Sequence, residues 1–206
     1  MPKLRSETIA ARKAHILKSA MVCFANNGYH QTTMEDIVQE AGLSKGGLYV
    51  HFSSKKELFI ALIECFIDEF SFFPTSAITG PTTYERLTGI LSGMVATIAS
   101  DTFRETSSLM TDVWAQNSRD QDINQVVLRL YAQVRYPLTQ LINEGIADGT
   151  FKPIDANALA NILIAVFEGL IIQDMVDESS VDWTAVSGTL DSLIAGQLMD
   201  GDQRTQ

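Results

Sequence analysis

The chain has 206 residues, of which 46% are hydrophobic and 19% charged, enough for one sizeable core or for a small head joined to a larger body. This composition excludes disordered and fibrous proteins. The N-terminal segment lacks the apolar stretch of a secretory signal. The most apolar window, 158–176, contains Asn161, Glu168 and Gln173, which would be costly in a bilayer. We therefore expect a buried helix in a soluble, cytoplasmic protein that has no membrane partner.

The net charge of −10 is distributed unevenly along the chain. Residues 1–60 contain eight Lys and Arg against five Asp and Glu, a formal charge of +3. Residues 61–206 contain seven against twenty, a formal charge of −13. An acidic body repels a polyanion, so a nucleic-acid partner would have to meet the basic head.

Cysteine and histidine usage gives little support for a metal or redox centre. Cys23 and Cys65 fall in amphipathic helical patterns, which favours core positions over a disulfide, with redox sensing as the alternative. The three histidines are scattered and form no cluster at ligand spacing. The sequence also shows no glycine-rich phosphate loop and no nucleophile elbow. We therefore expect no metal, no cofactor and no enzymatic activity.

Apolar spacing and capping signals predict four helices in the first seventy residues, at about 7–27, 33–41, 44–52 and 54–72. Gly28 ends the first helix. A threonine followed three positions later by an acid, either Thr32 with Glu35 or Thr33 with Asp36, predicts a capping box at the second. Ser44 can cap the third, and Ser54 with Glu57 the fourth. Two short helices separated by a glycine-containing turn are typical of a helix-turn-helix.

The third predicted helix contains two adjacent glycines, Gly46 and Gly47, each of which costs about 1 kcal/mol relative to alanine. A recognition helix gives them a purpose, because a backbone without Cβ atoms comes close to the sugar-phosphate wall. Leu48 and Phe52 would then pack inward. The alternative is a Gly-Gly loop followed by a buried strand.

Residues 10–60, above all TTMEDIVQEAGLSKGGLYVHFSSKKELF, resemble the DNA-binding head of the TetR family of bacterial transcriptional regulators. The Thr-Thr entry, the Ala-Gly-Leu-Ser-Lys-Gly turn, Leu-Tyr-x-His-Phe and Ser-x-Lys-x-x-Leu carry this resemblance over about the first third of the chain. It implies an all-α fold, with a helix-turn-helix domain at 1–60 and a larger antiparallel helical body at 61–206 for ligand binding and dimerisation.

The resemblance also implies DNA contacts by residues of the second, third and fourth helices. They are Thr33, Ser44, Lys45, Gly46, Gly47, Tyr49, His51 and Lys55. Gly47 departs from the larger side chain usual at its place, so base discrimination would depend more on Leu43, Ser44, Lys45 and DNA shape. For Tyr49, a partly buried aromatic is the alternative.

The body is predicted to contain five helices, at about 82–100, 102–117, 120–148, 155–177 and 181–199. Pro137 should kink or split the third of them. Asp155 is expected to cap the fourth, and Ser180 or Asp182 the fifth.

The last two helices have apolar faces that suit a four-helix bundle formed by two subunits, with a monomer core as the alternative. The predicted interface residues are Leu159, Ile162, Val166, Leu170, Trp183, Val186, Leu190 and Leu193.

An effector pocket in the middle of the body is implied by the family, although its aromatic and Met-containing stripes are also consistent with simple core. The predicted lining residues are Phe103, Met110, Trp114, Tyr131, Val134 and Phe167. The effector is expected to be small, mainly apolar, and neutral or cationic because the body is acidic. The fourth predicted helix is the only continuous element that starts at a phosphate-contacting lysine and ends within the body, so an effector that wedges the body helices apart is expected to tilt it together with the head.

The sequence thus predicts a dimeric repressor that binds a palindromic DNA operator and is released by this effector. The alternative is a ligand-independent DNA-organising or protein-interaction factor with the same fold.

Overall fold

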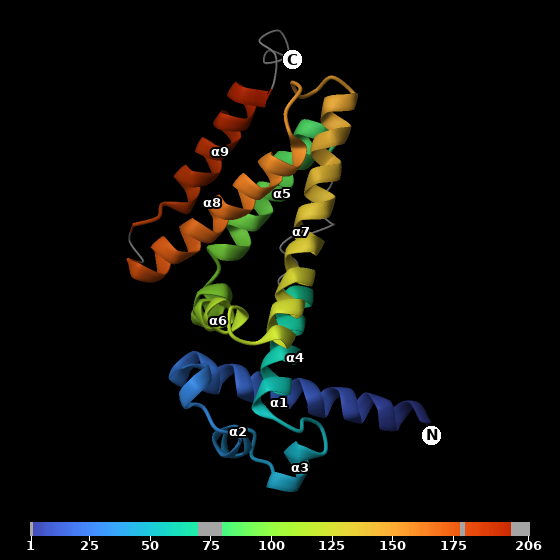
Figure 1. Cartoon of the computed structure of the whole chain (residues 1–206), viewed down its shortest axis with the longest axis vertical. Coiled ribbons are helices and arrows are strands. Elements are labelled where there is room, and N and C mark those ends of the chain that lie inside the picture. The colour runs from blue at the N-terminus through green and yellow to red at the C-terminus, as the bar shows by residue number, and fades with distance from the viewer. Residues whose placement is uncertain (1, 70–79, 178–179, 199–206) are drawn as a thin grey trace. The chain divides into compact units, whose positions relative to one another are not determined.

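The computed structural model describes residues 2–69, 80–177 and 180–198, and its regular structure over these residues is helical (Figure 1). The helices are α1 (Pro2–Gln31), α2 (Met34–Glu40), α3 (Lys45–Tyr49), α4 (Lys55–Glu69), α5 (Thr83–Ile98), α6 (Asp101–Asn117), α7 (Gln121–Ala147), α8 (Ala156–Val176) and α9 (Trp183–Leu198). The predicted all-α class is confirmed.

The chain divides into two compact units. The first contains the residues up to Glu69 together with Glu105–Val127, and the second contains the remainder. Helices α6 and α7 each contribute residues to both units. Helix α4 is described as far as Glu69, within the first unit, so its predicted course into the body stays a prediction.

Local capping signals determine the ends of the head helices. The predicted stop at Gly28 is the one non-helical residue within α1, with φ of 74°. Thr33 caps α2 in a capping box, in which its hydroxyl accepts from the Asp36 amide at 3.2 Å and the Asp36 carboxylate accepts from the Thr33 amide at 2.8 Å. The prediction for α2 is confirmed.

Helix α3 is shorter than predicted, ending at Tyr49 rather than near residue 52. The Ser44 hydroxyl caps it by accepting from the Gly47 amide at 3.1 Å. Ser54 likewise caps α4 through the Glu57 amide, but the Glu57 carboxylate accepts from Ser53 instead of completing the box at Ser54. The predicted continuation of α4 to residue 72 lies outside the described residues.

The core of the first unit joins α1, α2, α3 and α4 through fully buried aliphatic side chains and one aromatic cluster. The Phe59 ring lies 4.5 Å from Tyr29 and meets Phe24 edge-on at 5.5 Å, between ring centroids. Each such side chain contributes about 1.5–3 kcal/mol on burial. The aliphatic members include Ile16, Ile37, Leu48 and Leu58.

Polar contacts attach α6 and the start of α7 to the head. The Asp112 carboxylate accepts a hydrogen bond from the Tyr29 amide at 2.8 Å. Lys56 pairs with Asp120 at 3.2 Å and with Asp122 at 2.6 Å. The head is therefore held by residues that are far away in the sequence.

In the second unit, α5 and α7 run antiparallel. Near the start of α5, the Thr83 hydroxyl donates to Asp148 at 2.5 Å and Arg86 pairs with Glu144 at 2.9 Å, at the end of α7. Helix α7 continues through Pro137 as one element, so the predicted split does not occur.

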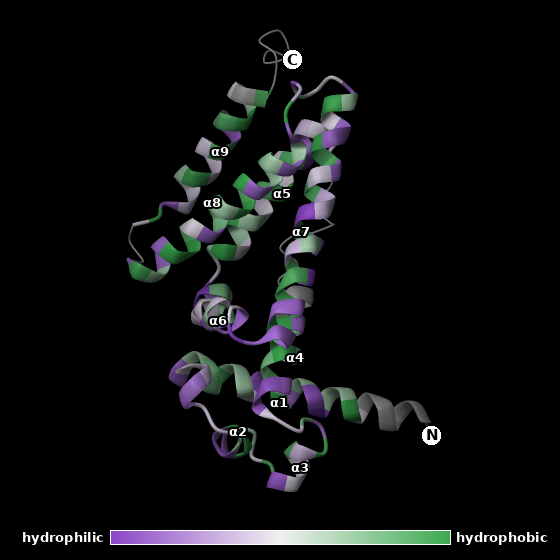
Figure 2. Cartoon of the chain, viewed as in Figure 1, coloured by the Kyte–Doolittle hydropathy of each residue, from purple (hydrophilic) through white to green (hydrophobic). Residues whose placement is uncertain are grey.

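Helix α8 is the one element, among the described residues, long and apolar enough to cross a membrane by length and composition alone. Figure 2 shows hydrophobic residues along most of its length. Only 28% of its most apolar 18-residue window is buried, and Ile162 and Val166 are exposed. The expectation of a buried helix is therefore wrong for one side of α8, whose apolar residues have no cover within the part of the chain that the structure describes.

Candidate DNA-binding surface

Helix α3 and its flanking residues present an exposed surface. Thr33, Ser44, Lys45, Gly46 and Tyr49 are exposed, whereas Gly47, His51 and Lys55 are partly buried. Leu48 and Phe52 point into the core, as predicted. Sequence reasoning overlooked Val50, which is 82% exposed beside Tyr49. An apolar side chain so exposed on a recognition helix can contact thymine methyl groups.

The ammonium group of Lys45 is held by the Glu35 carboxylate at an exposed position, where DNA could replace that carboxylate. Its Nζ atom lies 2.5 Å from a Glu35 carboxylate oxygen and 5.8 Å from the centroid of the Tyr49 ring. The hydrogen bond to Glu35, followed by its charge, raises the pKa of Lys45. Both side chains are exposed, and exposed pairs contribute little to stability. The ammonium can therefore leave Glu35 for a phosphate or a guanine edge at small cost.

The glycines differ in what surrounds them. A Cβ atom at Gly46 would meet no heavy atom within 4 Å, so the packing of the chain does not require glycine there. A Cβ atom at Gly47 would lie 3.2 Å from Ser44 Oγ and would crowd the helix cap. The openness at Gly46 favours the approach of an external backbone, whereas Gly47 also has a structural reason.

Lys55 differs from the predicted phosphate contact. Its Nζ atom donates to the carbonyl oxygens of Tyr29 at 2.7 Å, Thr32 at 2.9 Å and His30 at 3.1 Å. Burial lowers the pKa of Lys55. Because an ammonium has three N–H donors, all are used to cap the end of α1. The geometry favours an internal capping role for Lys55 over DNA contact.

A hollow of about 430 Å³ lies between α1 and the end of α3. Arg12 and His51 are its charged or titratable members, and Val50 is the most exposed apolar one. It extends the candidate surface from α3 onto α1, which the sequence had assigned no DNA contact. The full lining is Thr8, Ile9, Arg12, Gly47, Val50 and His51.

Comparison with known proteins identifies the family. Residues 16–62 match the model of bacterial regulatory proteins of the tetR family, and residues 83–199 match that of the C-terminal domain of BetI-type transcriptional repressors. YfiR of Bacillus subtilis (strain 168), an uncharacterized HTH-type transcriptional regulator, is 31% identical over 205 residues, covering 93% of this chain and 92% of the relative. The chain belongs to the TetR family.

Solved structures agree on the fold of this TetR-family protein. A transcriptional regulator from Saccharomonospora viridis, solved with choline, matches with a TM-score of 0.79 at 22% identity and covers 93% of this chain and 99% of that one. FadR from Bacillus subtilis, solved with stearoyl-CoA, matches with a TM-score of 0.73 at 20% identity, covering 88% and 96%.

The family assignment fixes the general activity. The chain is a DNA-binding transcriptional repressor with a helix-turn-helix head, not an enzyme, as the sequence predicts. It belongs to a family of soluble transcription regulators.

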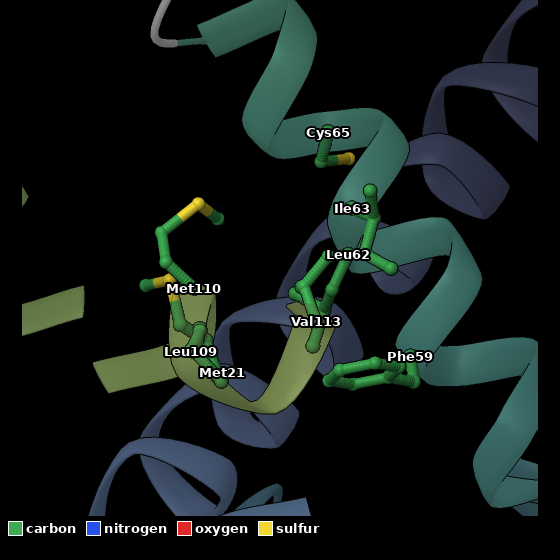
Figure 3. Close-up of a pocket in the computed structure, with 8 residues that line it drawn as sticks. All are labelled: Met21, Phe59, Leu62, Ile63, Cys65, Leu109, Met110 and Val113. Carbon is green, nitrogen blue, oxygen red and sulfur yellow. The ribbon is translucent and has the colours of Figure 1, made fainter. Parts of the chain in front are cut away.

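One cavity of this TetR-family protein lies within the first unit, between α4 and α6 with α1 behind (Figure 3). Its volume is about 30 Å³, room for about one water molecule. Of the predicted effector-pocket residues only Met110 lines it. The cavity is too small for an effector in this conformation. Its lining is Met21, Phe59, Leu62, Ile63, Cys65, Leu109, Met110 and Val113.

The other predicted pocket residues are divided between the units. Trp114 belongs with Met110 to the first unit, whereas Phe103, Tyr131, Val134 and Phe167 belong to the second. Phe103 and Phe167 are buried, and the Tyr131 hydroxyl donates to Glu168 on α8. A pocket lined by all six residues stays a prediction.

The predicted interface residues also occupy different environments. Ile162, Val166 and Leu193 are exposed, and Leu159, Leu170, Val186 and Leu190 are partly buried. Trp183 is buried within its own subunit, where its indole N–H donates to Asp174 at 3.2 Å. Trp183 thus belongs to the core of the subunit rather than to the exposed face, because Asp174 offers its N–H a buried partner.

Proposed function

We propose that this TetR-family repressor works as a cytoplasmic homodimer that binds a palindromic operator and leaves it when a small apolar effector binds. A single helix-turn-helix reads a short half-site. Two copies of α3 about 34–36 Å apart would enter successive major grooves and address an inverted repeat.

The uncovered apolar face of α8 and α9 carries this proposal. Ile162 on α8 is 59% exposed and Leu193 on α9 is 55% exposed, with Val166 one turn after Ile162. On α9 the small residues Ala185, Gly188 and Ser192 are also exposed. Apolar side chains beside small ones allow close packing of helices, so α8 and α9 of two subunits suit a four-helix bundle.

The test replaces Ile162 with glutamate and measures mass by sedimentation and affinity for an inverted-repeat DNA by fluorescence anisotropy. A charge buried at the interface should give monomers and weaken operator binding. Ile154→Glu is the matched control, because Ile154 is 44% exposed but precedes α8. A dimer of wild-type strength in Ile162→Glu would place the interface elsewhere.

The effector is supported by the arrangement of α6 and by the relatives. Choline and stearoyl-CoA in related structures show that the fold accommodates small molecules of very different size. In this chain α6 touches the head through Asp112 and Tyr29, so a ligand that shifts α6 disturbs the end of α1. DNA affinity then falls by the ligand's differential affinity for the two conformations. A DNA complex that no ligand weakens would favour the ligand-independent alternative.

A further inference from the structure

Two buried polar atoms on α7 lack hydrogen-bond partners in the part of the chain that the structure describes. They are Nε of Arg135 and Oγ1 of Thr139. Residues four apart lie on the same face of a helix, one turn from each other. More than nine in ten buried polar groups in native proteins find a partner, so two orphans on adjacent turns require a physical reason.

Other threonines and arginines of the second unit do form the hydrogen bonds and ion pairs that Thr139 and Arg135 lack. The hydroxyls of Thr88 and Thr97 donate to carbonyls four residues earlier, at 3.1 and 2.9 Å, whereas the Thr139 hydroxyl does not. Arg86 and Arg104 each pair with a carboxylate. Arg135 forms no ion pair with a described residue, although residues 61–206 contain twenty acids.

We propose that Arg135 and Thr139 form a subsite for an anionic group, a carboxylate or a phosphate, on the effector. The inference rests on the proposed effector response and specifies its chemistry. A guanidinium donates two parallel hydrogen bonds to such a group, and a hydroxyl one turn away adds a third. Arg135 is only partly buried, so part of it is accessible to a ligand.

The neighbouring residues suit an amphiphilic ligand. Both Tyr131, one turn before Arg135 on α7, and Val134, directly before it in the sequence, are predicted pocket residues. Both are only partly buried. An anionic head held at Arg135 would therefore have aromatic and aliphatic surface next to it for an apolar chain.

Local charge outweighs the net charge of the body here. The formal charge of −13 over residues 61–206 was the reason to expect a neutral or cationic effector. Surface charges are screened beyond roughly 8 Å at physiological ionic strength, whereas a contact with Arg135 acts at about 3 Å. The Tyr131 hydroxyl, one turn before Arg135, donates to Glu168, and no ion pair joins Arg135 to an acid among the described residues. We therefore expect an anionic amphiphile.

The test compares decanoate, 1-decanol and decyltrimethylammonium, which share a chain and differ in head charge, with inorganic phosphate as a head without a chain. Thermal shift of the full-length dimer should give the tightest binding for decanoate. Arg135→Met should weaken decanoate roughly 10- to 100-fold, which corresponds to one or two charge-assisted hydrogen bonds, and should leave 1-decanol unchanged. Arg129→Met, on the exposed side of the same helix, is the matched control.

Stability of the ligand-free protein separates a binding role from a structural one. Replacing an unpartnered polar group with an apolar one is neutral or stabilising, so Arg135→Met should melt at or above the wild-type temperature. A lower melting temperature, or equal affinity for all three decyl compounds, or binding by none of the four probes, would overturn the subsite. Decanoate binding that depends on Arg135 but leaves operator affinity unchanged would instead contradict only the proposed effector response.

Discussion

Replacing Lys55 with methionine separates the two roles that this lysine has been given. Methionine has a similar unbranched stem but no ammonium, so the carbonyls of Tyr29, His30 and Thr32 lose a shared donor that now lies 2.7–3.1 Å away. The ammonium also lies 4.6 Å from the centroid of the Tyr29 ring, and that attraction is lost. The end of α1, against which the aromatic cluster packs, loses its cap.

The expected cost follows from these contacts. A hydrogen bond from a charged donor contributes about 1.5–3 kcal/mol. Three bonds from one ammonium do not add in full, because burial of the charge, which lowers the pKa of Lys55, offsets part of them. We expect about 2–3 kcal/mol in total. For a chain of this size, about 2–4 °C per kcal/mol translates this into a melting temperature lower by about 4–12 °C.

Circular dichroism melts and operator titrations at several salt concentrations measure both effects. Lys18→Met, at an exposed position of α1, controls for the lost charge and should melt like the wild type. If Lys55 is internal, the salt slope of operator binding stays near that of the wild type. The capping role would be refuted by a Lys55→Met protein with the wild-type melting temperature and a slope of log binding constant against log salt concentration that is smaller by about one unit. That result would support the predicted phosphate contact of Lys55.

Two further predictions concern the head. Gly46→Val should abolish most operator binding and shift the melting temperature by only a few degrees, because a Cβ atom there meets no protein atom within 4 Å; wild-type affinity by anisotropy would show that DNA does not approach this backbone. Hydrogen bonds from Thr33 and Ser53, each by amide and then hydroxyl, lower the pKa values of Asp36 and Glu57. The two carboxylates therefore stabilise the folded state fully above their unfolded-state pKa values near 4, and this stabilisation is lost as the pH falls through their lower folded-state pKa values. The double variant Asp36→Asn/Glu57→Gln should melt at a lower temperature than the wild type at pH 7, and its melting temperature should fall less on acidification to pH 3. If circular dichroism shows the same pH dependence of the melting temperature for both proteins, these pKa shifts are contradicted.

Helix boundaries could be predicted from the sequence because capping is local. Thr33, Asp155 and Asp182 accept from an amide three residues ahead, so the signal and the partner share one short window. The body helices accordingly begin and end within about two residues of the predicted bounds. Of the two caps proposed for α9, Asp182 takes that place, and Ser180 donates to the Asp177 carbonyl instead.

Contacts between distant residues could not be predicted in the same way. Lys55 reaches carbonyls 23 to 26 residues earlier, and Trp183 finds Asp174 across the turn between α8 and α9. Helix α8 is apolar on several sides, so its pattern does not tell which side faces its own subunit. Arg135 was overlooked for a related reason, since the lack of a counter-charge is a property of the fold and not of any sequence window.

If the proposed effector binds at Arg135, helix α7 would provide a physical link between ligand and operator. Helix α7 contains Arg135 in the second unit, and its first turn includes Asp122, which pairs with Lys56 on α4. A helix transmits displacement because its backbone hydrogen bonds resist bending, so a ligand that prefers one position of α7 also biases the Lys56 contact. Such coupling is reciprocal: if the ligand weakens operator binding tenfold, the operator must weaken ligand binding tenfold. Decanoate titrations with and without saturating operator DNA measure this factor directly, and equal affinities in the two titrations would show that α7 carries no coupling.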